Sequence, residues 1–256
     1  MSSSLPEAFL RLPLAHRALH DGEMGRPENS RAAVAAAITA GYGIEIDLQA
    51  SSDGEAMVFH DYALMRLTAE TGPVRLRTAQ ELCCIPLKGG DGEGIPTLAE
   101  VLSMVAGRVP VLIEIKDQDG GMGPDVGILE AATARALAGY DGPIAVMSFN
   151  PHSVAAFGDL APAIPRGLTT SAYAIEDWPL SREMCDRLRD IPDIGRTAAR
   201  FISHEASDLA RPRVQALRAQ GLPVLCWTIN SQAEEDAARP LCDNITFEGY
   251  GAVIPP

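Results

Sequence analysis

Eight short apolar segments, separated by stretches with helical character, run along the chain and constrain its fold more than any other feature. Continuous apolar segments of this kind are typical of strands buried on both faces, as in a parallel sheet. The Ala- and Leu-rich stretches between most of them have the character of helices that pack on such a sheet. The predicted strands are 12–15, 43–48, 110–115, 144–147, 164–168, 200–202, 224–227 and 244–247, and the clearest predicted helices are 30–40, 98–105, 126–138, 153–160, 210–220 and 232–239.

This alternation predicts an α/β fold, a (β/α)8 TIM barrel formed by residues 1–256 as a single domain. A doubly wound sheet is the alternative, but such sheets often have a Gly-rich first turn, which this sequence lacks. The segment from about 61 to 96 is long and irregular, so we expect an insertion after the second strand, at the barrel mouth. Asn29 is the expected N-cap of the first predicted helix, and Gly41 is its expected end.

The chain is acidic, with 34 Asp and Glu against 21 Lys and Arg and a net charge of −13. This charge argues against binding to nucleic acid or to an anionic membrane surface. No apolar run reaches the ~18 residues of a membrane helix, and no secretory signal is recognisable, so we expect no stable membrane insertion and a cytoplasmic location. An anionic substrate would have to be attracted by a local cluster of positive charge or by a bound cation.

Three carboxylates interrupt two of the apolar strands. Glu45 and Asp47 are two residues apart, so they share one face of their strand, and Glu114 lies within the next barrel strand. A charged side chain inside an apolar strand is costly unless it is paired or binds a metal. Three carboxylates from neighbouring strands suit a hard divalent cation such as Mg²⁺ or Ca²⁺.

Two histidines and two cationic side chains also lie where apolar segments end. His16 and Arg17 follow the first segment, His60 follows an apolar Val-Phe pair, and Lys116 shares the strand face of Glu114. Each of these features alone is more often structural than functional. Their joint occurrence at successive strand ends, where barrel active sites lie, points to metal-assisted chemistry on a phosphate.

The combination resembles the glycerophosphodiester phosphodiesterase family, in order and over nearly the whole chain. The resemblance is most specific in the first half and looser in the last third. The matching segments are His16-Arg17, Pro27-Glu28-Asn29-Ser30, Glu45-Ile46-Asp47-Leu48-Gln49, Ser52-Asp53-Gly54, Val58-Phe59-His60-Asp61, Ile95-Pro96-Thr97-Leu98, Glu114-Ile115-Lys116, Ser148-Phe149 and Trp227-Thr228-Ile229-Asn230.

The resemblance implies an α/β barrel with a short insertion after strand two. It also implies a metal-dependent enzyme that cleaves glycerophosphodiesters to glycerol 3-phosphate and an alcohol. It gives each polar residue at the strand ends a role. These are a general acid–base pair (His16 and His60), the ligands of one divalent cation (Glu45, Asp47 and Glu114) and cationic groups near the phosphate (Arg17 and Lys116).

Two further residues are candidate substrate contacts. Trp227 would pack against the glycerol or an apolar moiety, or else fill the core. His204 would line the pocket, or else cap a loop. Two positions depart from the family pattern: Ala18 stands where Gly is usual, and Glu248 stands where Asp is common. If the turn at Ala18 needs a positive φ, the methyl group costs ~1 kcal/mol. We expect both departures to affect substrate preference and to leave the metal and histidine positions untouched.

Three other functions compete with the glycerophosphodiesterase hypothesis. A lysophospholipase D acting on longer lipid phosphodiesters should have an apolar groove at the mouth. The insertion contains Leu82, Ile85 and Leu87 but is mostly polar, which favours small soluble diesters. A Mg²⁺-dependent barrel aldolase would not need two strand-end histidines and an arginine. A barrel that binds glycerophosphodiesters without turnover predicts the loss of a histidine or a metal ligand, and neither is lost.

Overall fold

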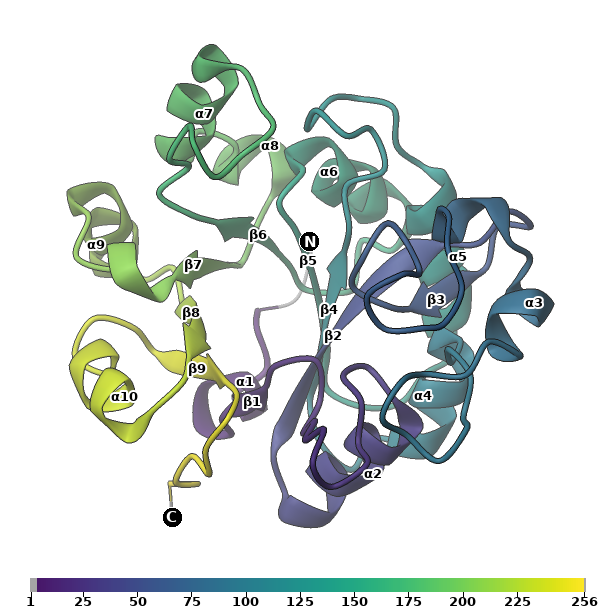
Figure 1. Cartoon of the computed structure of the whole chain (residues 1–256). Helices are drawn as coiled ribbons and strands as arrows, with labels where there is room; N and C mark the ends of the chain where they lie inside the picture. Colours follow the sequence, from purple (N-terminus) through teal and green to yellow (C-terminus); the bar gives the residue numbers. More distant parts are fainter. Residues whose placement is uncertain (1–3, 256) are drawn as a thin grey trace.

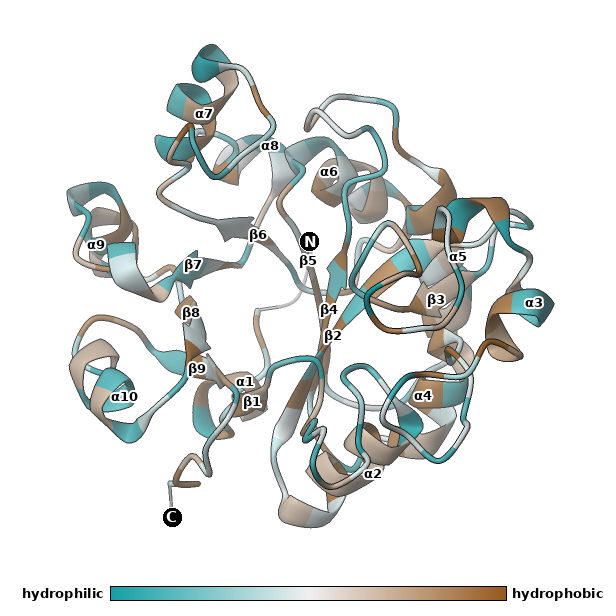
Figure 2. Ribbon diagram, in the orientation of Figure 1, coloured by the Kyte–Doolittle hydropathy of each residue, from teal (hydrophilic) through white to brown (hydrophobic). Residues whose placement is uncertain are grey.

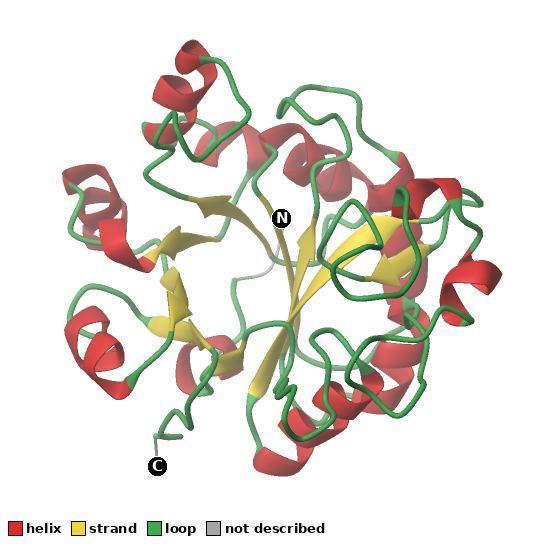
Figure 3. Ribbon diagram, in the orientation of Figure 1, coloured by secondary structure: helices red, strands yellow, loops and turns green. Residues whose placement is uncertain are grey.

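The chain forms a closed barrel of eight parallel strands surrounded by helices (Figure 1, Figure 3). The computed structural model describes residues 4–255. The first strand pairs with both the second and the last, which closes the ring. The barrel strands are β1 Leu14–Ala15, β2 Gly43–Ala50, β4 Val111–Ile115, β5 Ile144–Ser148, β6 Arg166–Thr170, β7 Phe201–Glu205, β8 Val224–Ile229 and β9 Asn244–Phe247. The predicted (β/α)8 barrel is confirmed.

A short ninth strand, β3 Ala56–Val58, pairs antiparallel with the end of β2 and was not among the predicted strands. The helices of the described residues are α1 Ala8–Arg11, α2 Arg31–Ala40, α3 Ala79–Cys83, α4 Leu98–Val105, α5 Ile128–Leu137, α6 Pro151–Leu160, α7 Arg182–Arg189, α8 Ile194–Thr197, α9 Pro212–Ala219 and α10 Gln232–Ala238, with 3-10 turns at Val74–Leu76 and Ala206–Asp208.

The start of α2 corrects one prediction. Ser30, not Asn29, is the N-cap, because the Ser30 side chain accepts a hydrogen bond from the Ala33 amide. Asn29 is instead buried in a left-handed conformation (φ 58°) and donates to Asp47. Gly41 ends the helix as predicted, with a φ of 79°.

The side chains of β2 explain how an apolar barrel comes to hold acidic groups. Ile44, Ile46 and Leu48 belong to the core between the strands and the helices. The alternation of a strand therefore turns Glu45 and Asp47 to the opposite face, which is the barrel interior. Figure 2 shows the largely apolar colouring of β2 and β4 and the more hydrophilic colouring of α7.

The amino-terminal segment lies against one end of the barrel. The Phe9 side chain of α1 is fully buried in a cluster with Leu112, Phe201 and other residues from strand starts. Asn244 at the start of β9 donates hydrogen bonds to the carbonyl oxygens of Phe9 (2.8 Å) and Leu12 (2.7 Å). The polar interior residues thus gather at the other end, where the strands finish.

The segment after β3 has a small core of its own. Leu82, Ile85 and Leu87 are buried there against Phe59 and other apolar residues. They do not line the barrel mouth, so they give no information on whether the mouth has an apolar groove. Among the described residues, no helix is long and apolar enough to cross a membrane.

Candidate active site

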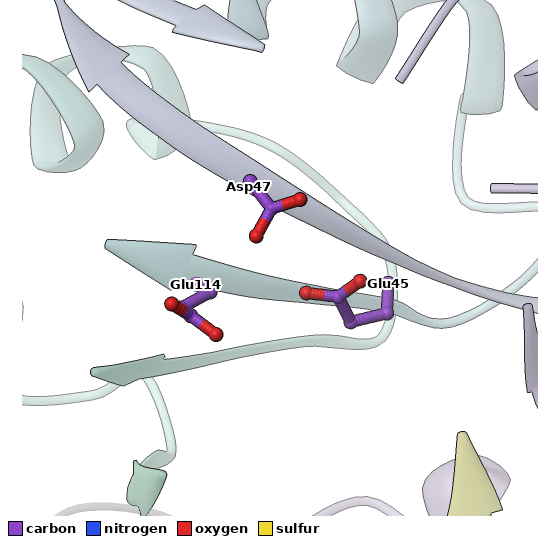
Figure 4. A group of neighbouring side chains, drawn as sticks. All are labelled: Glu45, Asp47 and Glu114. Carbon is purple, nitrogen blue, oxygen red and sulfur yellow. The ribbon is translucent and has the colours of Figure 1, made fainter. Parts of the chain in front are cut away.

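Three buried carboxylates from β2 and β4 meet inside the barrel (Figure 4). Asp47 and Glu114 are directly paired in the strand register, and Glu45 lies two residues before Asp47. One ligand atom from each of the three side chains lies within 4.8 Å of the others. The structure thus brings the three predicted cation ligands together.

The three carboxylates repel one another, and nearby positive charge stabilises their ionised forms. Burial raises the pKa of Glu45 well above its usual range, and the charges of Asp47 and Glu114 raise it further. Burial would also raise the pKa of Asp47, but the Lys116 ammonium holds it below its usual range. Lys116 Nζ lies 2.7 Å from Asp47 and 2.6 Å from Glu114, so its single positive charge is shared between two members of the cluster.

His16 is held by a carboxylate from the other end of the chain. Its Nδ1 lies 2.7 Å from Glu248 Oε2, and the same oxygen lies 3.2 Å from His20 Nε2. These hydrogen bonds keep the pKa of Glu248 far below its usual range. An ionised carboxylate only accepts hydrogen bonds, so the His16 Nδ1 carries a proton and, in the neutral ring, Nε2 is the free base.

His60 has the same arrangement with a neighbour in sequence. Its Nδ1 lies 2.7 Å from Asp61 Oδ1. Burial would raise the pKa of Asp61, but hydrogen bonds from Arg66 and His60 lower it to about 2. Burial lowers the pKa of His60, and the Lys116 charge lowers it further, so the neutral imidazole is favoured at pH 7.

A chain of ion pairs connects the two sides of the site. Arg66 donates to both Asp61 and Glu28, and Glu28 in turn accepts from Arg17 Nη1 at 2.9 Å. The Arg17 amide donates to Glu45 at 3.0 Å, and its guanidinium Nε lies 3.7 Å from Asp47. Arg17 is therefore fixed between the first strand and the carboxylate cluster.

Both histidines open onto one small cavity of about 130 Å³. Seven of the nine predicted site residues line this cavity. The lining consists of His16, Arg17, Glu45, His60, Glu114, Lys116, Met147, Phe149, Trp227, Thr228 and Thr246, with Asp47 bonded to Lys116 behind it.

Comparison with known proteins agrees with this geometry. The glycerophosphoryl diester phosphodiesterase family model matches residues 16–244. The chain belongs to this family. A glycerophosphodiester phosphodiesterase of Caldanaerobacter subterraneus subsp. tengcongensis is 32% identical over 182 residues, which is 68% of this chain and 72% of the relative.

Solved structures of the family have the same fold. A phosphodiesterase of Oleispira antarctica, in complex with the product sn-glycerol-3-phosphate, superposes with a TM-score of 0.75, at 25% identity and 93% coverage of both chains. A glycerophosphodiester phosphodiesterase of Thermotoga maritima has a TM-score of 0.67 at 22% identity, covering 91% of this chain and 92% of the other.

The departure from the family at Ala18 has a local cost. Arg17 and Ala18 have φ values of 52° and 63°, in the left-handed region. A residue with a Cβ pays roughly 1–2 kcal/mol there. The turn aims the Arg17 amide at the Glu45 carboxylate and the Ala18 amide at the Glu45 carbonyl, so the strain orients a predicted cation ligand.

The prediction that Glu248 does not contact the site histidines was wrong. Glu248 contacts His16 directly. His20, which the sequence analysis did not single out, shares this carboxylate. A signal was present, because Glu248 follows the last strand and the last strand of a closed barrel neighbours the first.

His204 is the one predicted contact that the structure does not bring to the site. Its side chain is fully buried, with Nδ1 2.8 Å from Thr170 Oγ1 and Nε2 3.2 Å from Asp208. The residues lining the cavity within the described chain do not include it. Trp227 does line the cavity, where its indole donates to the Ser203 carbonyl and its ring meets Phe149 edge to face.

Proposed function

We propose that this family member hydrolyses glycerophosphodiesters to glycerol 3-phosphate and an alcohol by acid–base catalysis from His16 and His60. The observation that carries the proposal is the pair of imidazoles, each backed at Nδ1 by a carboxylate, on a cavity that also borders three buried carboxylates. Such pairs orient an imidazole and leave its other ring nitrogen facing the substrate.

The two histidines move protons in opposite directions. One imidazole takes a proton from the attacking hydroxyl, which belongs to water or to the 2-hydroxyl of the glycerol. A new P–O bond forms while the P–O bond to the alcohol breaks, and the other imidazole protonates the leaving alkoxide. If the glycerol hydroxyl attacks first, water then opens the cyclic phosphate in a second step with the same residues.

We propose Glu45, Asp47 and Glu114 as ligands of one divalent cation, Mg²⁺ or Ca²⁺. Their oxygen donors and mutual repulsion fit such an ion. When bound, the cation supplies positive charge that offsets the negative charge of the phosphodiester. Arg17 and Lys116 add positive charge at the same cavity, so an acidic protein can still hold an anionic substrate.

The glycerol arm of the substrate fits the small cavity. The Thr246 hydroxyl borders it and is buried without a hydrogen-bond partner among the described residues. A buried hydroxyl without a partner is costly, and a substrate hydroxyl would supply one. Trp227 offers an apolar face beside it.

The proposal predicts release of glycerol 3-phosphate from purified protein with Mg²⁺ or Ca²⁺. We expect turnover of at least one diester in a panel containing glycerophosphocholine, glycerophosphoethanolamine and glycerophosphoglycerol, measured with a coupled glycerol 3-phosphate assay. A chelator should abolish turnover, and added cation should restore it. Absence of turnover across all diesters and both cations would contradict the proposal and favour a barrel that only binds these molecules.

Glu248 is proposed as the residue that positions His16. Glu248→Gln keeps the size of the side chain and removes the charge that accepts from His16 and His20. We expect kcat to fall by about 10- to 100-fold with little change in KM, because binding groups are unaffected. The exposed Glu55→Gln variant serves as the control. A kcat within twofold of the unsubstituted protein would show that Glu248 has no such role.

A further inference from the structure

A second and larger cavity, of about 550 Å³, adjoins the small one at the barrel mouth. The two cavities share His60, Glu114, Lys116 and Phe149, so they meet where the proposed function places the phosphate. A phosphodiester has two arms on one phosphorus atom. A substrate whose phosphate lies at the shared residues therefore places one arm in each cavity.

Aromatic and methionine side chains form most of the apolar wall of the larger cavity. They come from the loops after β3, β4, β5 and β6, which border the same mouth (Figure 1). Phe149 lies between the cavities, with its ring centroid 5.0 Å from Trp178 on one side and 5.5 Å from Trp227 on the other. The apolar lining consists of Tyr62, Ala63, Met65, Met122, Phe149 and Trp178.

The charged residues of this wall already have partners. Asp61 is bonded to His60 and Arg66, and Arg66 also to Glu28. Asp117 accepts three backbone amides, among them that of Gly120 at 2.8 Å, and the side-chain amide of Asn150 at 2.8 Å. A polyol or an ammonium group in the cavity would thus meet carboxylates and guanidinium groups that are already hydrogen-bonded.

Exposed apolar side chains continue this wall to the surface. Tyr62 is 56% exposed and Met65 is 61% exposed, although both are large and hydrophobic. Apolar side chains left in water around a concave site are typical of a surface that a ligand covers. The volume of the cavity also exceeds what a two-carbon head group would fill.

We propose that the larger cavity binds the alcohol arm of the diester and selects an apolar alcohol, alkyl or aromatic, over a charged or polyhydroxylated head group. This inference rests on the proposed function, because it requires that glycerol 3-phosphate be the product. The polar, smaller cavity with Thr246 takes the glycerol arm, and the apolar alcohol leaves from the larger one.

The test is a series of synthetic diesters of glycerol 3-phosphate with ethanol, butanol, hexanol, choline and 3,3-dimethylbutanol. The last alcohol is the neutral carbon isostere of choline. We expect kcat/KM to rise along the alkyl series, by up to about fourfold per methylene. The dimethylbutyl diester should be hydrolysed at least as fast as the choline diester. Release of glycerol 3-phosphate identifies the arm that leaves.

Met65→Gln tests the wall itself, with Met24→Gln as the matched control. Both methionines are exposed, at 61% and 68%, but only Met65 lines the cavity. We expect Met65→Gln to lower the hexyl-to-ethyl ratio of kcat/KM at least threefold and Met24→Gln to leave that ratio unchanged.

Several outcomes would overturn the inference while the proposed function stands. One is a hexyl-to-ethyl ratio of kcat/KM that is one or less in the unsubstituted protein, or that Met65→Gln does not change. Another is a tenfold preference for the choline diester over the dimethylbutyl diester. The last is faster hydrolysis of a lysophospholipid, whose acyl chain is on the glycerol arm, than of the alkyl diesters. Absence of glycerol 3-phosphate from every diester would overturn the proposed function and the inference together.

Discussion

Replacing His60 with alanine is expected to lower kcat for glycerophosphodiester hydrolysis by about 10²- to 10⁴-fold, the range typical of a lost general acid or base. His60 is bonded through Nδ1 to Asp61 and lines the small cavity from the loop after β3, while the three proposed cation ligands lie on β2 and β4. Cation affinity should therefore persist. Steady-state release of glycerol 3-phosphate measures the first effect, and isothermal titration with Ca²⁺ measures the second.

His152→Ala is the control for this substitution. His152 lies in the first turn of α6 and borders neither cavity, so its loss should change kcat by less than twofold. Full activity of His60→Ala would refute the proposed acid–base role. A large loss of cation affinity in the same variant would place His60 in the cation site instead.

The barrel could be predicted because its strands are continuous apolar segments, which the sequence displays directly. The last strand, Asn244–Phe247, has the predicted bounds. Helix α7 could not be predicted in this way. Its residues, Arg182–Arg189, are mostly charged, and only Cys185 and Leu188 are buried, so its apolar face is too narrow to stand out in the sequence.

The carboxylates and histidines could be predicted because each belongs to a strand or ends an apolar run. Their partners could not be chosen from local pattern, since they depend on how the barrel closes. The register pairs Ala15 with Phe247, which makes His16 and Glu248 the next neighbours although 232 residues separate them. The apolar wall was missed for a similar reason, because Tyr62, Met122 and Trp178 lie in loops without periodicity.

Glu45→Gln is expected to have two effects of opposite sign. It should abolish cation-dependent turnover, because one of three proposed ligands loses its charge. It should also stabilise the cation-free protein. Burial and the charges of Asp47 and Glu114 raise the pKa of Glu45, so its ionised form is destabilising when no cation is bound. The Gln carbonyl oxygen can still accept the hydrogen bond from the Arg17 amide.

Thermal unfolding with chelator and with saturating Ca²⁺ or Mg²⁺ separates these effects. Cation at 100 times its Kd should stabilise the unsubstituted protein by about 2.7 kcal/mol, and Glu45→Gln should show little of this gain. Glu130→Gln is the control, because Glu130 is also buried but bonds Ser153 and the Gly127 amide far from the cluster. That variant should lose stability and keep the full response to cation.

A Glu45→Gln protein that is less stable than the unsubstituted one in chelator, yet still responds to cation, would mean that Glu45 contributes to packing and does not bind a cation. A Glu45→Gln protein that is more stable in chelator and no longer responds to cation would mean that repulsion among the three carboxylates destabilises the cation-free fold. Binding of the cation would then remove this cost.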